Sequence, residues 1–123
     1  MTPAQVRTVW GTAYGRCRDC RTPTWYFNYQ PFSPQGVGVE FRRGRVDALF
    51  TLWSPMGWRT TRGLRIGDDE ARVTATYGAL NRGECGSYRV LLLPRGRVVS
   101  AFSIVNGRVW GFALLRPPSR TCR

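Results

Sequence analysis

Two hairpin patterns with the same turn residues constrain the fold of this 123-residue chain more than any other feature. The first is predicted over 37–50 with its turn at Gly44, and the second over 99–112 with its turn at Asn106-Gly107. Both turn glycines are followed by Arg-Val, and they lie 63 positions apart (107 − 44). Asn-Gly between alternating apolar residues is the strongest short-range signal of a type I′ turn. In the first hairpin, the alternation predicts that Glu40 and Arg42 face solvent.

A short helical pattern precedes each hairpin. The first helix begins after Thr2 and ends at Gly11, whereas the second begins after Asp68 or Asp69 and ends at Gly78. The residues expected on the apolar sides of the two helices are Val6, Val9, Trp10, Val73, Thr76, Tyr77 and Leu80. The two terminating glycines lie 67 positions apart (78 − 11), close to the spacing of the hairpin turns. We therefore predict an internal duplication.

The repeated order predicts an α+β fold. In it, two tandem repeats, each a helix followed by about three antiparallel strands, share one curved antiparallel sheet with short helices on one face. The length fits a single domain over 1–123. Its predicted parts are repeat 1 over about 2–53, a connector over 54–63, repeat 2 over about 64–116 and a C-terminal tail over 117–123. The connector combines turn residues with tryptophan, which favours a packed bridge over a flexible linker.

Four cysteines form an even set, for which three connectivities are possible. We favour Cys17–Cys20, within one loop, and Cys85–Cys122, which fastens the tail to the loop over 83–85 of the second repeat. The alternatives are a redox-active Cys-x-x-Cys pair and a zinc site. No thioredoxin-like strand-helix-strand order surrounds Cys17, and Cys85 and Cys122 lie far apart without a histidine to complete a metal site. We predict structural disulfides, no metal and no cofactor.

Structural disulfides are typical of oxidising compartments outside the cytosol. The apolar runs are shorter than a membrane span requires, so we expect no transmembrane segment. The predicted location is therefore secreted, periplasmic or cell-envelope, with the leader peptide absent from this chain.

The charge of the chain is strongly unbalanced. It contains 19 basic residues, all of them arginine, and 7 acidic residues, giving a formal net charge of +12. Such a field attracts polyanions and acidic protein surfaces, although a GC-rich genome would also enrich arginine. Histidine is absent, which excludes the usual Ser-His-Asp and Cys-His catalytic arrangements. The acidic run 68–70 is explained by helix capping, and we predict that the protein is not an enzyme.

The stretch over 58–78 resembles a repeat common in bacterial secreted proteins. Its Gly67-Asp68 start, Val73 and Tyr77-Gly78 end, followed by a hairpin, are similar to the repeat of the beta-lactamase inhibitory proteins. They are also similar to the small lipoproteins of outer-membrane assembly that share that fold. Two tandem copies imply the inhibitory-protein arrangement, in which paired sheets form a concave face that grips a partner. The resemblance implies an architecture, and inhibition of a lactamase is not carried over with it.

Two short helices cannot cover both faces of a sheet this rich in aromatic residues. We therefore expect aromatic surface flanked by arginine to stay exposed, and Trp, Tyr and Arg are the residue types that dominate binding hot spots. The candidate binding residues are Tyr26, Arg45, Trp53, Trp58 and Trp110. The predicted function is recognition of an unknown envelope or extracellular protein through the exposed sheet face, by a monomer. The alternative is binding of a polyanion, either nucleic acid or an anionic envelope polymer, through the arginine-rich surface.

Overall fold

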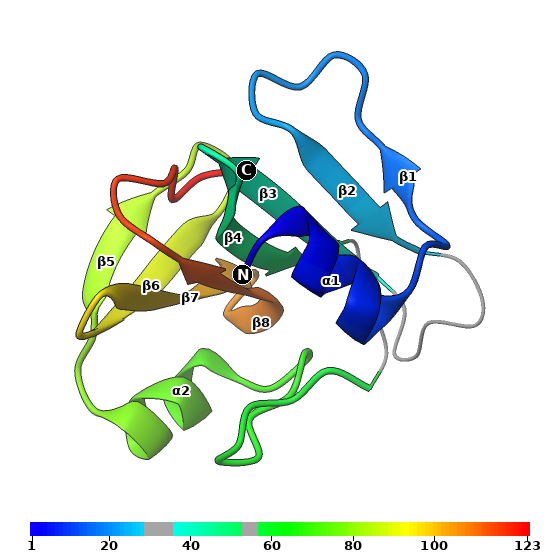
Figure 1. Cartoon of the computed structure of the whole chain (residues 1–123). Coiled ribbons are helices and arrows are strands. Elements are labelled where there is room, and N and C mark those ends of the chain that lie inside the picture. Colours follow the sequence, from blue (N-terminus) through cyan, green and yellow to red (C-terminus); the bar gives the residue numbers. More distant parts are fainter. Residues whose placement is uncertain (29–35, 53–56) are drawn as a thin grey trace.

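The computed structural model describes residues 1–28, 36–52 and 57–123. Within these ranges it contains two short helices and one open antiparallel sheet of eight strands (Figure 1). The elements are α1 (Pro3–Trp10), β1 (Gly15–Arg16), β2 (Thr24–Phe27), β3 (Val37–Arg42), β4 (Arg45–Thr51), α2 (Glu70–Tyr77), β5 (Asn81–Glu84), β6 (Arg89–Arg95), β7 (Val98–Val105) and β8 (Arg108–Leu115). The strand order in the sheet is β1-β2-β3-β4-β8-β7-β6-β5. The predicted α+β class with one antiparallel sheet is confirmed.

Each half of the chain has the same order, a helix and then four strands, and the halves meet where β4 pairs with β8. Both helices have eight residues and end in a glycine with positive φ, +85° at Gly11 and +82° at Gly78. The amide of Gly11 donates to the carbonyl of Arg7, and that of Gly78 donates to Thr74. Thr2 caps α1 as predicted, because its hydroxyl accepts the amide of Gln5 in a capping box.

The predicted hairpins also share a local geometry. Arg43-Gly44 has φ of 51° and 69°, and Asn106-Gly107 has φ of 51° and 72°. Two positive values between paired strands define a type I′ turn, so the prediction at Asn106-Gly107 is confirmed. In each hairpin a β-bulge follows three residues after the turn glycine, which places Asp47 and Trp110 at matching positions.

Two local expectations differ from the structure. Each half has four strands, because β1 forms directly before the Cys17–Cys20 loop and β5 takes in Gly83 and Glu84, which were expected in the second cysteine loop. These segments have no apolar alternation, and they become strands only through backbone pairing with β2 and β6. In α1, Val6 is buried but Val9 is exposed, because the short helix rests on the sheet with a narrow side.

Both helices pack on the same face of the sheet. Val6 of α1 joins a cluster with Trp25, Phe27, Val37, Val39 and Phe41, and Val73 of α2 joins one with Leu64, Leu91, Phe102, Ile104 and Val109. Leu49 packs on the first cluster and lies directly opposite Leu114 in the β4–β8 pair. Leu114 shares its side of β8 with Phe112, which packs on the second cluster. The helix-bearing face is therefore continuous across the seam between the halves.

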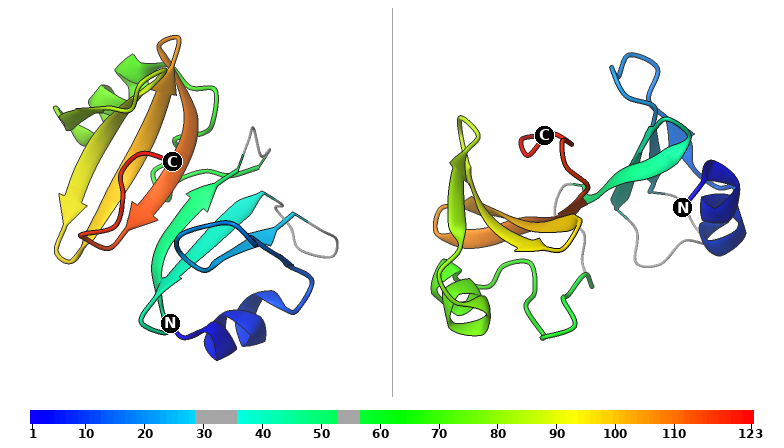
Figure 2. Two further views of the ribbon diagram at one scale, coloured as in Figure 1. Left: turned by 90° about the horizontal axis from the view of Figure 1, so that it is seen from above. Right: turned by 60° about the vertical axis from the view of Figure 1, so that its left-hand side comes forward.

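The other face is covered in part by the C-terminal segment, which lies on the side away from α2 (Figure 2). Arg123 extends over the ring of Phe50, 5.1 Å from its centroid, and its guanidinium donates to the Glu40 carboxylate at 2.9 Å. The prediction that Glu40 faces solvent is wrong, since the residue is 7% exposed. Arg42 is exposed as predicted. We call this side the tail face.

Both favoured cysteine pairs are present as disulfides. The Cα atoms of Cys17 and Cys20 are 5.6 Å apart, and those of Cys85 and Cys122 are 5.3 Å apart. Next to the second bond, the Tyr88 hydroxyl accepts the amide of Arg123 at 2.8 Å. The disulfide and this hydrogen bond hold the C-terminal segment against the second half of the sheet.

Candidate binding site

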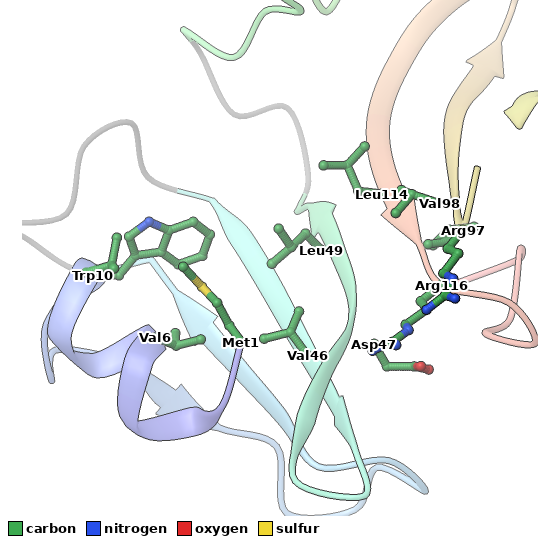
Figure 3. A pocket seen from close by; sticks show the side chains of 12 residues that line it. Met1, Val6, Trp10, Val46, Asp47, Leu49, Arg97, Val98, Leu114 and Arg116 are labelled. Carbon is green, nitrogen blue, oxygen red and sulfur yellow. The ribbon is translucent and has the colours of Figure 1, made fainter. Parts of the chain in front are cut away.

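On the helix-bearing face, two hollows adjoin at the seam between β4 and β8. The α1 hollow has a volume of about 460 Å³ and lies between α1 and the seam (Figure 3). The α2 hollow, of about 430 Å³, extends from the seam toward α2. Trp10, Leu49 and Leu114 line both hollows. We name the combined surface the seam groove.

The α1 hollow gathers exposed apolar side chains. Among the described residues, the exposed large hydrophobic side chains include Met1 and Val9, each 59% exposed, Leu114 at 48% and Val98 at 40%. All four line this hollow. Figure 3 shows Met1 on one side of it and Leu114 and Val98 on the other. Single exposed apolar residues are common on proteins, whereas a contiguous apolar surface marks an interaction site.

The α2 hollow is aromatic and its walls are held in place. Trp58, Tyr77 and Phe112 line it. The Tyr77 hydroxyl donates to the Thr60 hydroxyl at 2.8 Å, and its ring lies 5.3 Å from that of Phe102. The same Thr60 oxygen accepts the amide of Leu64, a fully buried core residue. The aromatic wall is therefore fixed by the core before any partner arrives.

Arginines surround both hollows. Three lining the α2 hollow and two lining the α1 hollow are Arg59, Arg62, Arg95, Arg97 and Arg116. The guanidinium groups of Arg62 and Arg95 lie 5.4 and 6.0 Å from the centre of the Tyr77 ring. None of the five forms an ion pair with a carboxylate in the part of the chain that the structure describes.

Five of the seven carboxylates of the chain pair with arginines that do not belong to the rim. Asp47 is the one acidic residue among the described residues that line the groove, and it accepts from Arg42 at 2.6 Å. Glu40, Asp68, Asp69 and Glu70 are paired with arginines outside the groove. The groove therefore combines an apolar floor with uncompensated positive charge.

The structure separates the five residues predicted for binding. Trp58 lines the seam groove. Tyr26 lies on the tail face, where it lines a hollow with Phe50 and Arg123. Arg45 is exposed beside the first hairpin turn, and Trp110 is 48% exposed at the bulge of β8; neither lines the groove. Trp53 lies outside the described residues.

Sequence reasoning missed most of the groove. Leu49 and Leu114 looked like ordinary strand residues, and Val98 lies directly before the predicted second hairpin; their exposure depends on how the two halves meet. A signal was present in β8, whose two faces are both apolar, and in Trp10 and Tyr77, the residues preceding the glycines that end the helices. These patterns indicated surplus apolar surface without giving its location.

A second arginine-aromatic cluster lies near β1. Tyr14 stacks on Trp25 with ring centres 4.0 Å apart, and the Arg16 guanidinium donates to the Tyr14 hydroxyl at 3.4 Å. This hydrogen bond lowers the pKa of Tyr14 below its usual value, against an opposing effect of burial and with further help from Arg7. The lowered pKa therefore comes first from the Arg16 hydrogen bond and then from Arg7, with the positive charges of both arginines adding to it.

Other kinds of site find no support in the described residues. No group of three or more Cys, Asp or Glu side chains in these ranges is placed to hold a metal ion. No described helix is long and apolar enough to cross a membrane.

No protein-family model matches the sequence, and no curated protein matches it. The fold is similar to the crystal structure of a DUF4309 family protein (YjgB) from Bacillus subtilis, with a TM-score of 0.63. The similarity covers 94% of this chain and 78% of that chain at 14% sequence identity. At this identity the likeness concerns the α+β fold alone.

Proposed function

We propose that this protein is a non-catalytic binding module that recognises a protein partner through the seam groove. The observation that carries the proposal is the gathering of exposed apolar side chains, such as Leu114 and Val98, in one groove beside a fixed aromatic wall. Apolar anchors next to Trp, Tyr and Arg are the composition of interface hot spots. Of the residues predicted from the sequence for binding, Trp58 is the one that the proposal places at the interface.

The proposed location is secreted or cell-envelope. The two disulfides support an oxidising compartment. The chain has no histidine, and most of its carboxylates accept from arginines, so acid–base groups are scarce. This scarcity favours binding over catalysis as the role of the groove.

The function is tested by photo-crosslinking at two positions of β8. A benzophenone amino acid replaces Leu114 in one sample and Trp110 in the other; both positions are 48% exposed, but only Leu114 lines the groove. Crosslinking is carried out in intact cells of the organism that encodes the chain, and adducts are identified by mass spectrometry. We expect one protein to be enriched at position 114 and not at 110, and the purified partner to bind at least tenfold more weakly to Leu114→Glu. Equal labelling from both positions, or adducts from position 110 alone, would contradict the proposal.

Leu114→Glu must not act by unfolding the protein. Because Leu114 is half exposed, we expect its substitution to change the free energy of unfolding by no more than about 0.5 kcal/mol. Urea unfolding of Leu114→Glu beside Trp110→Glu checks this. A large loss in the first variant alone would show that Leu114 has a structural role instead.

Polyanion binding is the second candidate function. The observation in its favour is the set of five arginines around the groove with no ion-pair partner among the described carboxylates. Polyanion affinity falls steeply as salt rises from about 50 to 200 mM, whereas an interface with apolar anchors loses much less. Elution from a heparin column below physiological salt would count against this alternative.

We also propose that the two halves are tandem copies of one unit, as the resemblance to the beta-lactamase inhibitory proteins implies. The matching helix lengths, terminating glycines, type I′ turns and bulge positions support a duplication. The proposed boundaries remain about 2–53 and 64–116, and the proposed solution state is a monomer. Sedimentation velocity tests whether the chain is a monomer. Homologous sequences that contain one unit instead of two would test the duplication.

A further inference from the structure

We infer that the seam groove binds an acidic linear segment of its partner, with aliphatic or aromatic anchors between Asp or Glu residues. This inference rests on the proposed function, and it specifies the chemistry of the partner.

The charge of the rim selects a negative partner. Arg59, Arg62 and Arg95 border the α2 hollow, and Arg97 and Arg116 border the α1 hollow. A basic or neutral segment would leave these guanidinium groups near one another without counter-charges as the groove loses water. Carboxylates on the partner would supply charge-assisted hydrogen bonds and accelerate association.

The floor selects apolar side chains rather than bases. The most exposed floor residues, Met1, Val9, Val98 and Leu114, are aliphatic or thioether side chains. The aromatic rings of Trp10 and Tyr77 are half-buried, and the Tyr77 ring stacks on Phe102 and has the guanidinium groups of Arg62 and Arg95 over it. Single-stranded nucleic acid is bound by stacking on open aromatic faces. The observations therefore favour a peptide over a nucleic acid.

The arrangement fits an extended or short helical segment. Two hollows of similar volume, about 460 and about 430 Å³, share Trp10, Leu49 and Leu114 at their junction. Each can accept a large apolar side chain, and arginines lie beside both. A segment with two apolar anchors could place one anchor in each hollow, and acidic residues next to each anchor could pair with the arginines of the rim.

The inference is tested by selecting displayed random 12-residue peptides on the oxidised 123-residue chain at physiological salt. The library is first depleted on Leu114→Glu, so that the survivors require the groove. We expect the enriched peptides to carry net negative charge and at least two large apolar residues. Synthetic copies should bind the native protein at least tenfold more tightly than Leu114→Glu, as measured by fluorescence anisotropy.

Charge variants then separate the arginines of the rim from the general field. Arg62→Glu and Arg97→Glu should each weaken the selected peptides about tenfold, whereas Arg18→Glu, an exposed residue of the Cys17–Cys20 loop that lines neither hollow, should weaken them less than threefold. If peptide affinity falls equally in all three variants, the net charge of the protein, and not the rim, determines peptide binding. A twelve-nucleotide oligo-dT is measured beside the peptides, and tighter binding of it, abolished by Leu114→Glu, would overturn the peptide in favour of nucleic acid.

Two further results would overturn the inference. Enriched peptides that are neutral or basic would show that the rim does not select charge, and a library without enrichment would show that the groove does not take linear segments. In either case, crosslinking of one partner at position 114 would leave the proposed function standing. If the crosslink at position 114 is absent but acidic peptides are selected, the groove binds such peptides while the proposed recognition of a protein partner fails.

Discussion

The two faces of the sheet are covered by different kinds of structure. The helix-bearing face is covered by α1, α2 and the segment containing Trp58 and Leu64, and it carries two of the three buried clusters that the described residues form. The tail face has a smaller cluster around Ala48, Ala101 and Leu115, and beyond it lies the C-terminal segment with its charged Arg123. The cover of the helix-bearing face is held by apolar packing, whereas the cover of the tail face is held by a disulfide and an ion pair.

The difference explains where apolar surface stays open. Two eight-residue helices cover the centre of each half but leave the seam between β4 and β8 uncovered. On the tail face, the C-terminal segment reaches Phe50 of β4 and so lies over the seam region. The binding groove is therefore expected on the helix-bearing face, and four substitutions or titrations test this division.

The largest effect is expected on the helix-bearing face. Phe27 is fully buried beside Trp10, so Phe27→Ala should lower the free energy of unfolding by about 3–5 kcal/mol through lost contacts and a cavity. Phe50→Ala, on the tail face, should cost less because Phe50 is only half-buried. Urea unfolding of both variants measures the contrast, and equal losses would break it.

Removal of the disulfide that fastens the tail should have the next largest effect. Cys85 and Cys122 are 37 positions apart, and the chain-entropy model assigns such a loop about 3–4 kcal/mol. The double variant Cys85→Ser/Cys122→Ser should lose this amount in thermal or urea unfolding. Its control, Cys17→Ser/Cys20→Ser, opens a much shorter loop and should lose less. The reverse order would show that the tail is not held by the disulfide.

The ion pair of the tail face should contribute less than its disulfide. The side chains of Glu40 and Arg123 are 9% and 13% exposed, so Glu40→Gln leaves a nearly buried guanidinium without its counter-charge. We expect a loss of about 1–3 kcal/mol in urea unfolding. Asp69→Asn is the matched control, since its pair with Arg108 is exposed and 3.9 Å long, and it should change stability by less than about 1 kcal/mol. An unchanged Glu40→Gln protein would show that packing alone holds the tail.

The smallest effect concerns the ionisation of Tyr14. Its folded pKa is lowered, first by the hydrogen bond from Arg16, so its phenolate should form at lower pH than that of an unperturbed tyrosine. The resulting stabilisation is complete above the unfolded pKa near 10 and is lost as the pH falls through the folded pKa. Absorbance titration should lose its first phase in Tyr14→Phe and show a later phase in Arg16→Gln. A first phase that survives Tyr14→Phe belongs to another tyrosine.

Local sequence determined the elements with strong signals of their own. Asn106-Gly107 specifies a type I′ turn because both residues tolerate positive φ, and Thr2 and Gly11 bound α1 because they satisfy free backbone groups at its ends. Four cysteines allow three connectivities, and their positions favoured the pairing that the structure contains. The strand pattern was also sufficient for the α+β class, since its alternation needs no distant partner.

Only the tertiary structure decided which surfaces are covered. Glu40 looks solvent-facing in its strand, yet Arg123, distant in sequence, lies over it. Gly83 and Glu84 become strand because β6 lies beside them. Leu114 and Trp110 are equally exposed on one strand, and only the pairing of β4 with β8 places Leu114 in the groove. Alternation along a strand assigns two sides, but long-range packing determines what covers each side, and for this protein that determines where a partner can bind.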